Sequence, residues 1–122
     1  MSESFVKIML LVTGAITASM IFQFLAPRFV LKTLNKMQLE DEVGLFFARH
    51  WGMVVFGFGL LIIWAAYEPA LRLPVLAIAT FEKLCLVLMI ALNWQVAKGM
   101  FLAMLFDIGC VVLYSIYLAQ NL

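Results

Sequence analysis

The sequence predicts an all-α protein: a transmembrane four-helix bundle with a short interfacial amphipathic helix between helices 1 and 2. Hydrophobic residues make up 66% of the 122 residues, whereas charged residues make up only 12%. A soluble domain is about half apolar and about a quarter charged, so this chain lacks the polar surface that water requires. Its apolar runs are continuous rather than alternating, which favours membrane helices over a membrane β-barrel.

Four apolar runs of spanning length occupy almost the whole chain, so we expect a single transmembrane domain over residues 1–122. A helix needs about 20 apolar residues to cross a bilayer. The expected helices cover residues 5–26, 45–67, 73–96 and 100–120. Pro27 and Pro69 follow the first two runs and stop them. Pro74 falls in the first turn of the third run, where proline is tolerated, and Gly99 breaks the third run from the fourth.

The stretch RFVLKTLNKMQLEDEVG connects the first two runs and has a mixed character. Its apolar residues recur at helical spacing, namely Phe29, Val30, Leu34 and Met37. Its polar residues between them are Lys32, Lys36 and Gln38. This pattern predicts a short amphipathic helix lying in the membrane interface. The alternative is an ordinary polar connection.

Charge gives an expectation for location and topology. The net charge of +1 and the absence of a basic run predict no nucleic-acid partner. We expect an integral, multi-pass protein of a bacterial inner membrane. Five basic residues fall in the first and third connections: Arg28, Lys32, Lys36, Arg49 and Lys98. The opposite side has Lys7, Arg72 and, where it is counted, Lys83. The excess places these connections in the cytoplasm and both termini on the non-cytoplasmic side.

Polar residues inside the apolar runs are the candidates for a site, because such residues are costly in a bilayer. The helical repeat places one polar or small face on each helix, and together these faces form a polar seam. Measured along the helices from the third connection, Arg49 and Asp107 lie at similar depth, with Asn93 and His50 nearby. We therefore predict an Arg49–Asp107 ion pair, which is either a structural clamp or part of a site.

A second layer of the seam lies deeper and holds Glu82, Lys83 and Tyr114. We expect Tyr114 to donate its hydroxyl to Glu82 and Lys83 to turn outward. The candidate catalytic residues are the acids Glu82 and Asp107, as proton donor or acceptor. The candidate binding residues are Arg49, His50, Asn93 and Tyr114. Each of them also has a structural reading, and His50 fits a solvated position at the interface.

No metal site is predicted, because one histidine and two separated cysteines give no metal-ligand spacing. Cys85 and Cys110 fit small apolar side chains better than a redox pair. No known catalytic motif is present. No cofactor is predicted, and a bound lipid or quinone is the one small molecule that we consider.

The stretches ARHWGMVVFGFGLLIIWAA, PVLAIATFEKLCLVLMIAL and AMLFDIGCVVLYSIYLA resemble the DoxX-like family of small four-helix membrane proteins. The resemblance covers residues 45–119. It implies a four-helix bundle, and it marks Arg49, Glu82 and Asp107 as the positions of interest. Members of that family are associated with quinone-linked oxidation or with the assembly of other membrane proteins.

Three functions are compatible with the sequence. The first is an accessory, assembly or binding subunit of a membrane complex or of a homo-oligomer, because small-residue faces favour close helix contacts. The alternative is a membrane-embedded enzyme or carrier for a lipophilic substrate, such as a quinone or an isoprenoid or sterol-like lipid, acting through Glu82 and Asp107. A small oligomeric channel or transporter is the third hypothesis and the least favoured.

Overall fold

The computed structural model describes residues 1–122 and confirms an all-α chain with four long apolar helices. In chain order the elements are α1 (Glu3–Ala18), α2 (Ile21–Leu25), α3 (Pro27–Thr33), α4 (Glu42–Tyr67), the 3₁₀ turn η1 (Pro69–Leu71), α5 (Arg72–Leu92), α6 (Trp94–Ala97), the 3₁₀ turn η2 (Lys98–Met100) and α7 (Phe101–Asn121). The stretches long and apolar enough to cross a membrane are Glu3–Leu25, Glu42–Tyr67, Pro69–Leu92 and Trp94–Asn121. The chain is therefore a multi-pass membrane protein.

The first span is not one straight helix, because it bends between α1 and α2. Hydroxyl side chains donate back to carbonyls of the preceding turn at Thr13, Thr17 and Ser19. Such bonds compete with the helical ladder and bend helices. The predicted short helix between the first two spans is confirmed as α3, which starts with Pro27 at its first turn and ends at Thr33.

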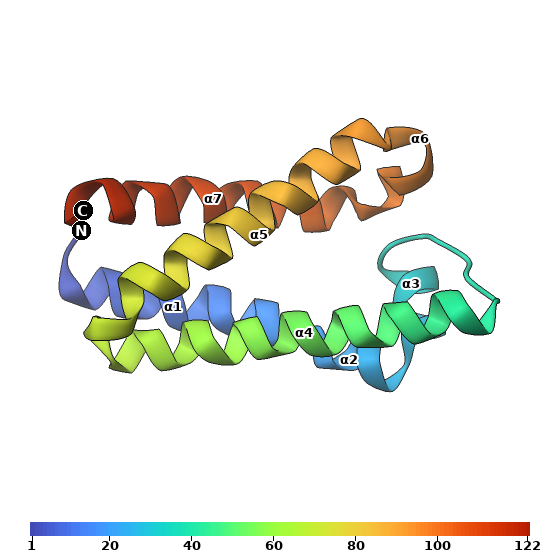
Figure 1. Cartoon of the computed structure of the whole chain (residues 1–122), viewed down its shortest axis with the longest axis horizontal. Helices are drawn as coiled ribbons and strands as arrows, with labels where there is room; N and C mark the ends of the chain where they lie inside the picture. Colours follow the sequence, from blue (N-terminus) through green and yellow to red (C-terminus); the bar gives the residue numbers. More distant parts are fainter.

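The long helices form two antiparallel pairs (Figure 1). In the first pair α1 and α2 lie along α4, and in the second pair α5 lies along α7. The pairs meet at the end that holds both chain termini and separate toward the end that holds α3 and α6. The main core fills the meeting point and comprises Val6, Met9, Leu10, Ile62, Ala65, Ala66, Leu76, Ala79, Cys110 and Tyr114.

Glycines allow the first pair to pack closely. A Cβ added at Gly59 would lie 2.6 Å from the Ala18 Cα, and one added at Gly52 would lie 2.9 Å from the Phe24 backbone nitrogen. Close backbone approach through small residues is a common way for membrane helices to associate. The first pair is therefore held at short range along most of α4.

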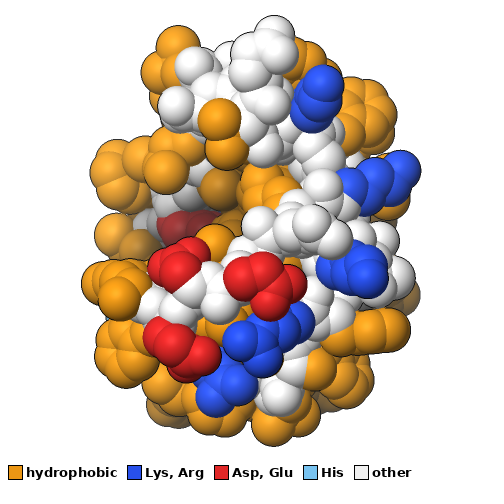
Figure 2. All heavy atoms as spheres, turned by 90° about the vertical axis from the view of Figure 1, so that its right-hand side faces the viewer, with side chains coloured by type: hydrophobic (Ala, Val, Ile, Leu, Met, Phe, Trp, Pro, Cys, Tyr) orange, Lys and Arg blue, Asp and Glu red, His pale blue; other side chains and the backbone are white.

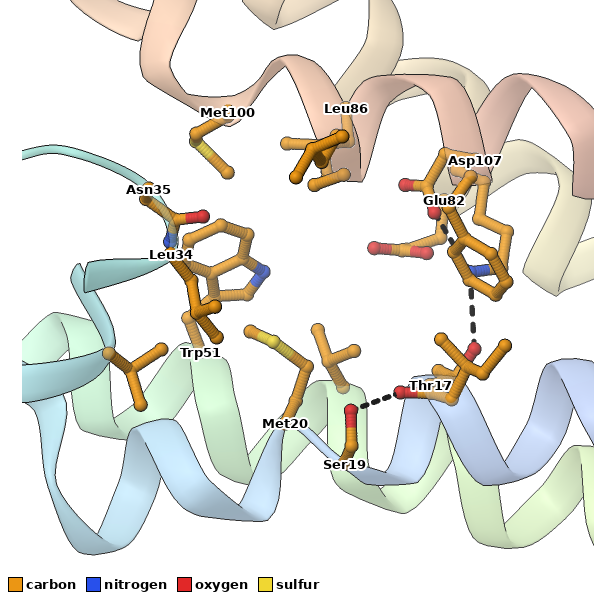
Figure 3. Close-up of a pocket in the computed structure, with 17 residues that line it drawn as sticks. Thr17, Ser19, Met20, Leu34, Asn35, Trp51, Glu82, Leu86, Met100 and Asp107 are labelled. Carbon is orange, nitrogen blue, oxygen red and sulfur yellow. Dashed lines mark hydrogen bonds and ion pairs between the residues drawn. The ribbon is translucent and has the colours of Figure 1, made fainter. Parts of the chain in front are cut away.

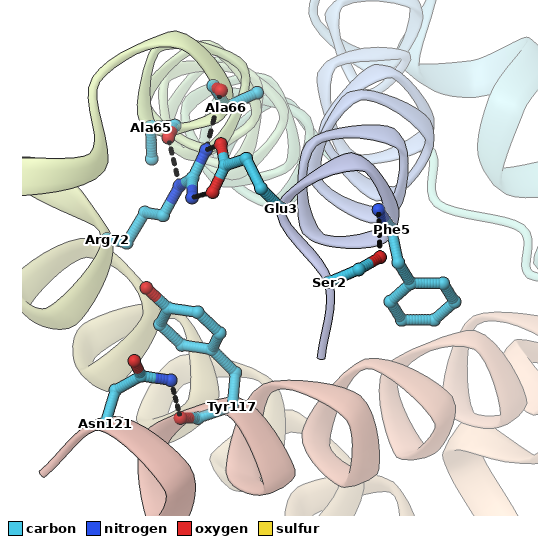
Figure 4. A network of polar contacts seen from close by, with 8 residues as sticks. All are labelled: Ser2, Glu3, Phe5, Ala65, Ala66, Arg72, Tyr117 and Asn121. Carbon is cyan, nitrogen blue, oxygen red and sulfur yellow. Dashed lines mark hydrogen bonds and ion pairs between the residues drawn. The ribbon is translucent and has the colours of Figure 1, made fainter.

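Arg72 joins three helices at the end where the pairs meet (Figure 4). Its side chain is buried and donates to the Ala65 and Ala66 carbonyls, each at 2.9 Å, in the last turn of α4. These carbonyls have no partner within their own helix, so Arg72 satisfies them. Two further bonds of 2.7 and 2.8 Å reach the carboxylate of Glu3 in α1. One guanidinium thus fixes α1, α4 and α5 together.

The opposite end of the molecule carries much of the exposed charge. Figure 2 shows clusters of acidic and basic side chains there, beside a hollow with an acidic side chain in its depth. Arg28 lies 3.8 Å from Glu40 and 3.7 Å from Glu42, but all three side chains are exposed. Exposed ion pairs of this kind contribute little to stability. The hollow, rather than these pairs, is the notable feature of this end.

Gly59→Ala should destabilise the protein, because its methyl group would force α1 and α4 apart. Overpacking of this kind costs about 1–3 kcal/mol in the free energy of unfolding. Gly57→Ala is the matched control in the same helix, because a Cβ at Gly57 meets no atom within 4 Å. Denaturant unfolding in detergent micelles measures both variants. Equal stability of the two would contradict the close α1–α4 approach.

Candidate functional site

The space between the separated helix pairs contains two adjoining cavities. The first has a volume of about 270 Å³ and lies between α1, α3 and α4 on one side and α5 and α7 on the other (Figure 3). The second is wider, about 1160 Å³, and lies between α4 and α5 under the segment that follows α3. The two share one wall, formed by Trp51, Glu82, Leu86 and Met100. The pairs therefore enclose a continuous gap at this end, beside a small apolar cluster of Ile90, Ala97 and Met100.

A buried ion pair lies where the gap narrows toward the core. The Lys83 ammonium is 3.1 Å from Asp107 Oδ1, and the two side chains are only 3% and 8% exposed. Lys83 Nζ also donates to the Thr17 hydroxyl at 3.3 Å. The same nitrogen lies 4.8 Å from the centre of the Phe106 ring, within the range of a cation–π contact. Lys83 therefore ties α5 to α7 and to α1.

The predicted Arg49–Asp107 pair is wrong, because Asp107 pairs with Lys83 instead. Arg49 is exposed, and none of the ion pairs includes it. Helix α4 buries Ala48 and Gly52 against α2, and the exposed Arg49 lies outside that buried face. The expectation that Lys83 turns outward is wrong for the same reason.

The length of the third span explains the error. This span was expected to continue to residue 96, but α5 ends at Leu92, and Asn93 begins the turn. Counted from that end, Lys83 is about 14 Å deep, given a rise of about 1.5 Å per residue. Asp107 is about 9 Å from the start of α7 by the same measure. A lysine side chain bridges this difference.

Tyr114 does not donate to Glu82 as predicted. Its hydroxyl donates to Thr13 Oγ1 at 2.6 Å, inside the main core, and the side chain is fully buried. Thr13 in turn donates to the Met9 carbonyl at 2.8 Å. The Tyr114 hydroxyl is thus occupied by α1, and Tyr114 lines neither cavity.

The other predicted site residues are distributed over the molecule. His50 is exposed and lines neither cavity. Asn93 borders the wider cavity, where its side chain donates to the Met89 carbonyl at 2.9 Å. Cys85 lines the wider cavity, whereas Cys110 is buried in the main core, and both are free thiols. The structure has no cluster of three His, Cys, Asp or Glu side chains that could hold a metal ion.

Glu82 is the one predicted acid that faces the gap without a partner. It belongs to the wall common to both cavities, and its carboxylate points into the first of them (Figure 3). None of the ion pairs includes it, although Lys83 is its neighbour in the chain. Asp107 already neutralises Lys83, so the ionised form of Glu82 leaves the gap with a net negative charge.

Two residues that line the first cavity were not predicted from the sequence. Asn35 is only 9% exposed, lines the first cavity, and makes no side-chain hydrogen bond within the chain. Trp51 turns its indole ring into the same cavity, on the side opposite Glu82 (Figure 3). Asn35 lies in the connection after α3, where helical periodicity gives no orientation. Trp51 was not predicted because the sequence placed Arg49, and not Trp51, on the inward face of this helix.

Comparison of the chain with protein-family models, with curated proteins and with solved structures found no match. The four-span architecture agrees with the resemblance to DoxX-like proteins, but that family is not confirmed. The functional argument therefore rests on the cavity and the side chains that line it.

Asp107→Ala should strongly destabilise the protein, because it leaves the buried Lys83 ammonium without its counter-charge. Breaking a buried ion pair by removing one partner costs about 3–5 kcal/mol. The double variant Lys83→Met/Asp107→Leu should recover most of this loss, since it removes both charges. Denaturant unfolding in micelles measures these variants. Arg49→Gln is the control, with an expected change below about 0.5 kcal/mol, and a larger loss there would support the rejected pairing.

Proposed function

We propose that this membrane protein binds a lipophilic molecule in the gap between its two helix pairs. The observation that carries the proposal is the position of Glu82, a half-buried acid without a partner on the wall common to both cavities. Ligand sites are concave and mostly apolar, with a few polar groups that orient the ligand. The first cavity matches this description, since 11 of its 17 lining residues are hydrophobic.

Access from the bilayer supports a ligand that dissolves in lipid. The cavities lie between helices of membrane-spanning length, and the second pair leans away from the first toward the α6 end (Figure 1). A lipophilic molecule can enter sideways between the pairs. Quinones and isoprenoid or sterol-like lipids have the required apolar body with few polar atoms. A role as a carrier or binding protein needs no further chemistry.

Proton transfer would extend this role to that of an enzyme. Asp107 is held by Lys83, so Glu82 is the acid available to exchange a proton with a ligand in the gap. A candidate acid or base must lie within hydrogen-bonding reach of the group it serves. Glu82 meets this condition for any ligand that fills the first cavity. The DoxX-like resemblance is compatible with such chemistry and stays a prediction.

Assembly with other membrane helices is the second candidate function. Gly57 in α4 and Gly109 in α7 serve no contact within the chain, because a Cβ at either meets no atom within 4 Å. Glycines with open space beside them on spanning helices allow close approach of a partner helix. They therefore favour a homo-oligomer or a place in a larger membrane complex.

Ala103→Trp should block binding, because the indole would fill the first cavity that Ala103 lines. Ala119→Trp is the matched control, since Ala119 is exposed near the end of the same helix. Native mass spectrometry from gently solubilised membranes should show a bound lipophile on the unmodified protein and on the control. The bound mass should fall at least about tenfold for Ala103→Trp, the loss expected for about 1.4 kcal/mol.

Identical ligand masses on the two tryptophan variants would contradict a site in this cavity. The same spectra report the oligomeric state. If an oligomer is present, Gly57→Leu and Gly109→Leu should convert it to monomers while leaving the fold intact. A monomer in the unmodified protein would remove the assembly role.

We also propose that both termini lie on the non-cytoplasmic side. The end that holds α3 and α6 carries Arg28, Lys32, Lys36, Arg49 and Lys98, whereas the end with the termini carries Lys7 and Arg72. In intact cells of a variant in which Cys85 and Cys110 are replaced by alanine, a membrane-impermeant thiol reagent should label Gln120→Cys but not Lys98→Cys. The reverse pattern would invert the topology.

A further inference from the structure

With Glu82 ionised, the charges around the gap do not balance. Glu82, Lys83 and Asp107 lie at the deep end of the first cavity, two acids against one base. Two of the three N–H donors of Lys83 are engaged, by Asp107 at 3.1 Å and Thr17 at 3.3 Å, and Asp107 neutralises its charge. An uncompensated charge in a low-dielectric site is costly, so a ligand that brings a positive charge is favoured there.

The opposite side of the cavity offers different chemistry. The Trp51 indole faces the cavity, and the Asn35 amide is nine-tenths buried beside it without a side-chain partner (Figure 3). Between these groups and Glu82 the wall is apolar, with Leu86 and Met100. An amide and a carboxylate without partners in the chain thus face one cavity from two sides, and polar groups in such positions normally bind a partner.

We propose that the ligand is a lipophilic amine, whose ammonium group pairs with Glu82 and whose apolar body lies along Leu86, Met100 and Trp51. This inference rests on the proposed function and names its ligand class. An ammonium group offers several N–H donors to the carboxylate, and charged hydrogen bonds are stronger than neutral ones. The ion pair cancels the excess charge of the gap.

Other headgroups fit the gap less well. A carboxylate ligand would need the positive charge of Lys83, which Asp107 already neutralises, and it would meet Glu82 as a like charge. An alcohol can donate one hydrogen bond to Glu82 but leaves the excess charge in place. The ammonium group is thus the headgroup that answers both the hydrogen-bonding and the charge requirement.

The test uses three probes that differ only in the headgroup: 12-bromododecylamine, 12-bromododecanol and 12-bromododecanoate. Bromine quenches tryptophan fluorescence at short range. The variant Trp64→Phe/Trp94→Phe leaves Trp51 as the sole tryptophan. The protein is placed in phosphatidylcholine nanodiscs, and saturable quenching of Trp51 reports binding. The amine should half-saturate at a concentration at least about tenfold below that of the alcohol, as expected for a charged hydrogen bond.

Glu82→Gln in the same background should abolish the preference for the amine and leave the affinity for the alcohol within about twofold. Retained alcohol binding shows that this variant is folded. Glu68→Gln is the matched control, because Glu68 is an exposed acid at the end of α4, and it should keep the full preference. Equal affinity for amine and alcohol, or a preference for the carboxylate, would overturn the inference.

If none of the three probes quenches Trp51 saturably, the proposed function itself is wrong, and this outcome differs from equal binding of amine and alcohol. The source of the amine is resolved by repeating the titration in nanodiscs that contain phosphatidylethanolamine. A weaker apparent affinity there would show that an aminolipid headgroup competes for Glu82. An unchanged affinity would assign the site to free lipophilic amines. Both results support recognition of an ammonium group.

Discussion

The guanidinium of Arg72 is the interaction on which the architecture depends. Arg72 belongs to α5. Its guanidinium donates to the carbonyls of Ala65 and Ala66 at the end of α4 and to the carboxylate of Glu3 in α1. Both residues are buried away from water, so the chain must supply a donor for their carbonyls. Because this donor sits at one end, polar contacts fix the two helix pairs there, whereas toward the other end they diverge and touch through apolar side chains, with Trp51 of α4 packed against the cluster of Ile90, Ala97 and Met100. The cavity is a consequence of that one-sided joint.

The ion pair between Lys83 and Asp107 marks the level at which the two helix pairs begin to diverge. It joins α5 and α7 within the second pair, and the bond from Lys83 to Thr17 extends it to α1. Beyond this level no polar contact crosses between the pairs, and the gap opens. A buried pair of this kind contributes less to stability than its short distance indicates, because desolvation offsets much of the attraction. Its stronger effect is to fix the position of the helices.

The sequence predicted the parts of this structure that depend on one helix at a time. Continuous apolar runs and prolines were sufficient for the four spans and the short helix, and residue composition was sufficient for the membrane. The partners of Asp107 and Arg72 could not be predicted, because they depend on the distance between helices and on the level at which each helix ends. Helix α5 ends at Leu92 rather than at residue 96, and Lys83 therefore lies within reach of Asp107. Asn35 lies in a connection, where no periodicity applies.

The free acid in the gap follows from the order of two adjacent residues. Consecutive positions on a helix point about 100° apart. Lys83 points toward α7 and α1, and Glu82 therefore points into the gap, beyond the reach of its own neighbour as a hydrogen-bonding partner. Because Asp107 neutralises Lys83, the charge of an ionised Glu82 is left without a partner in the chain. The structural ion pair thus creates the site: by occupying the one buried lysine, Asp107 leaves Glu82 available.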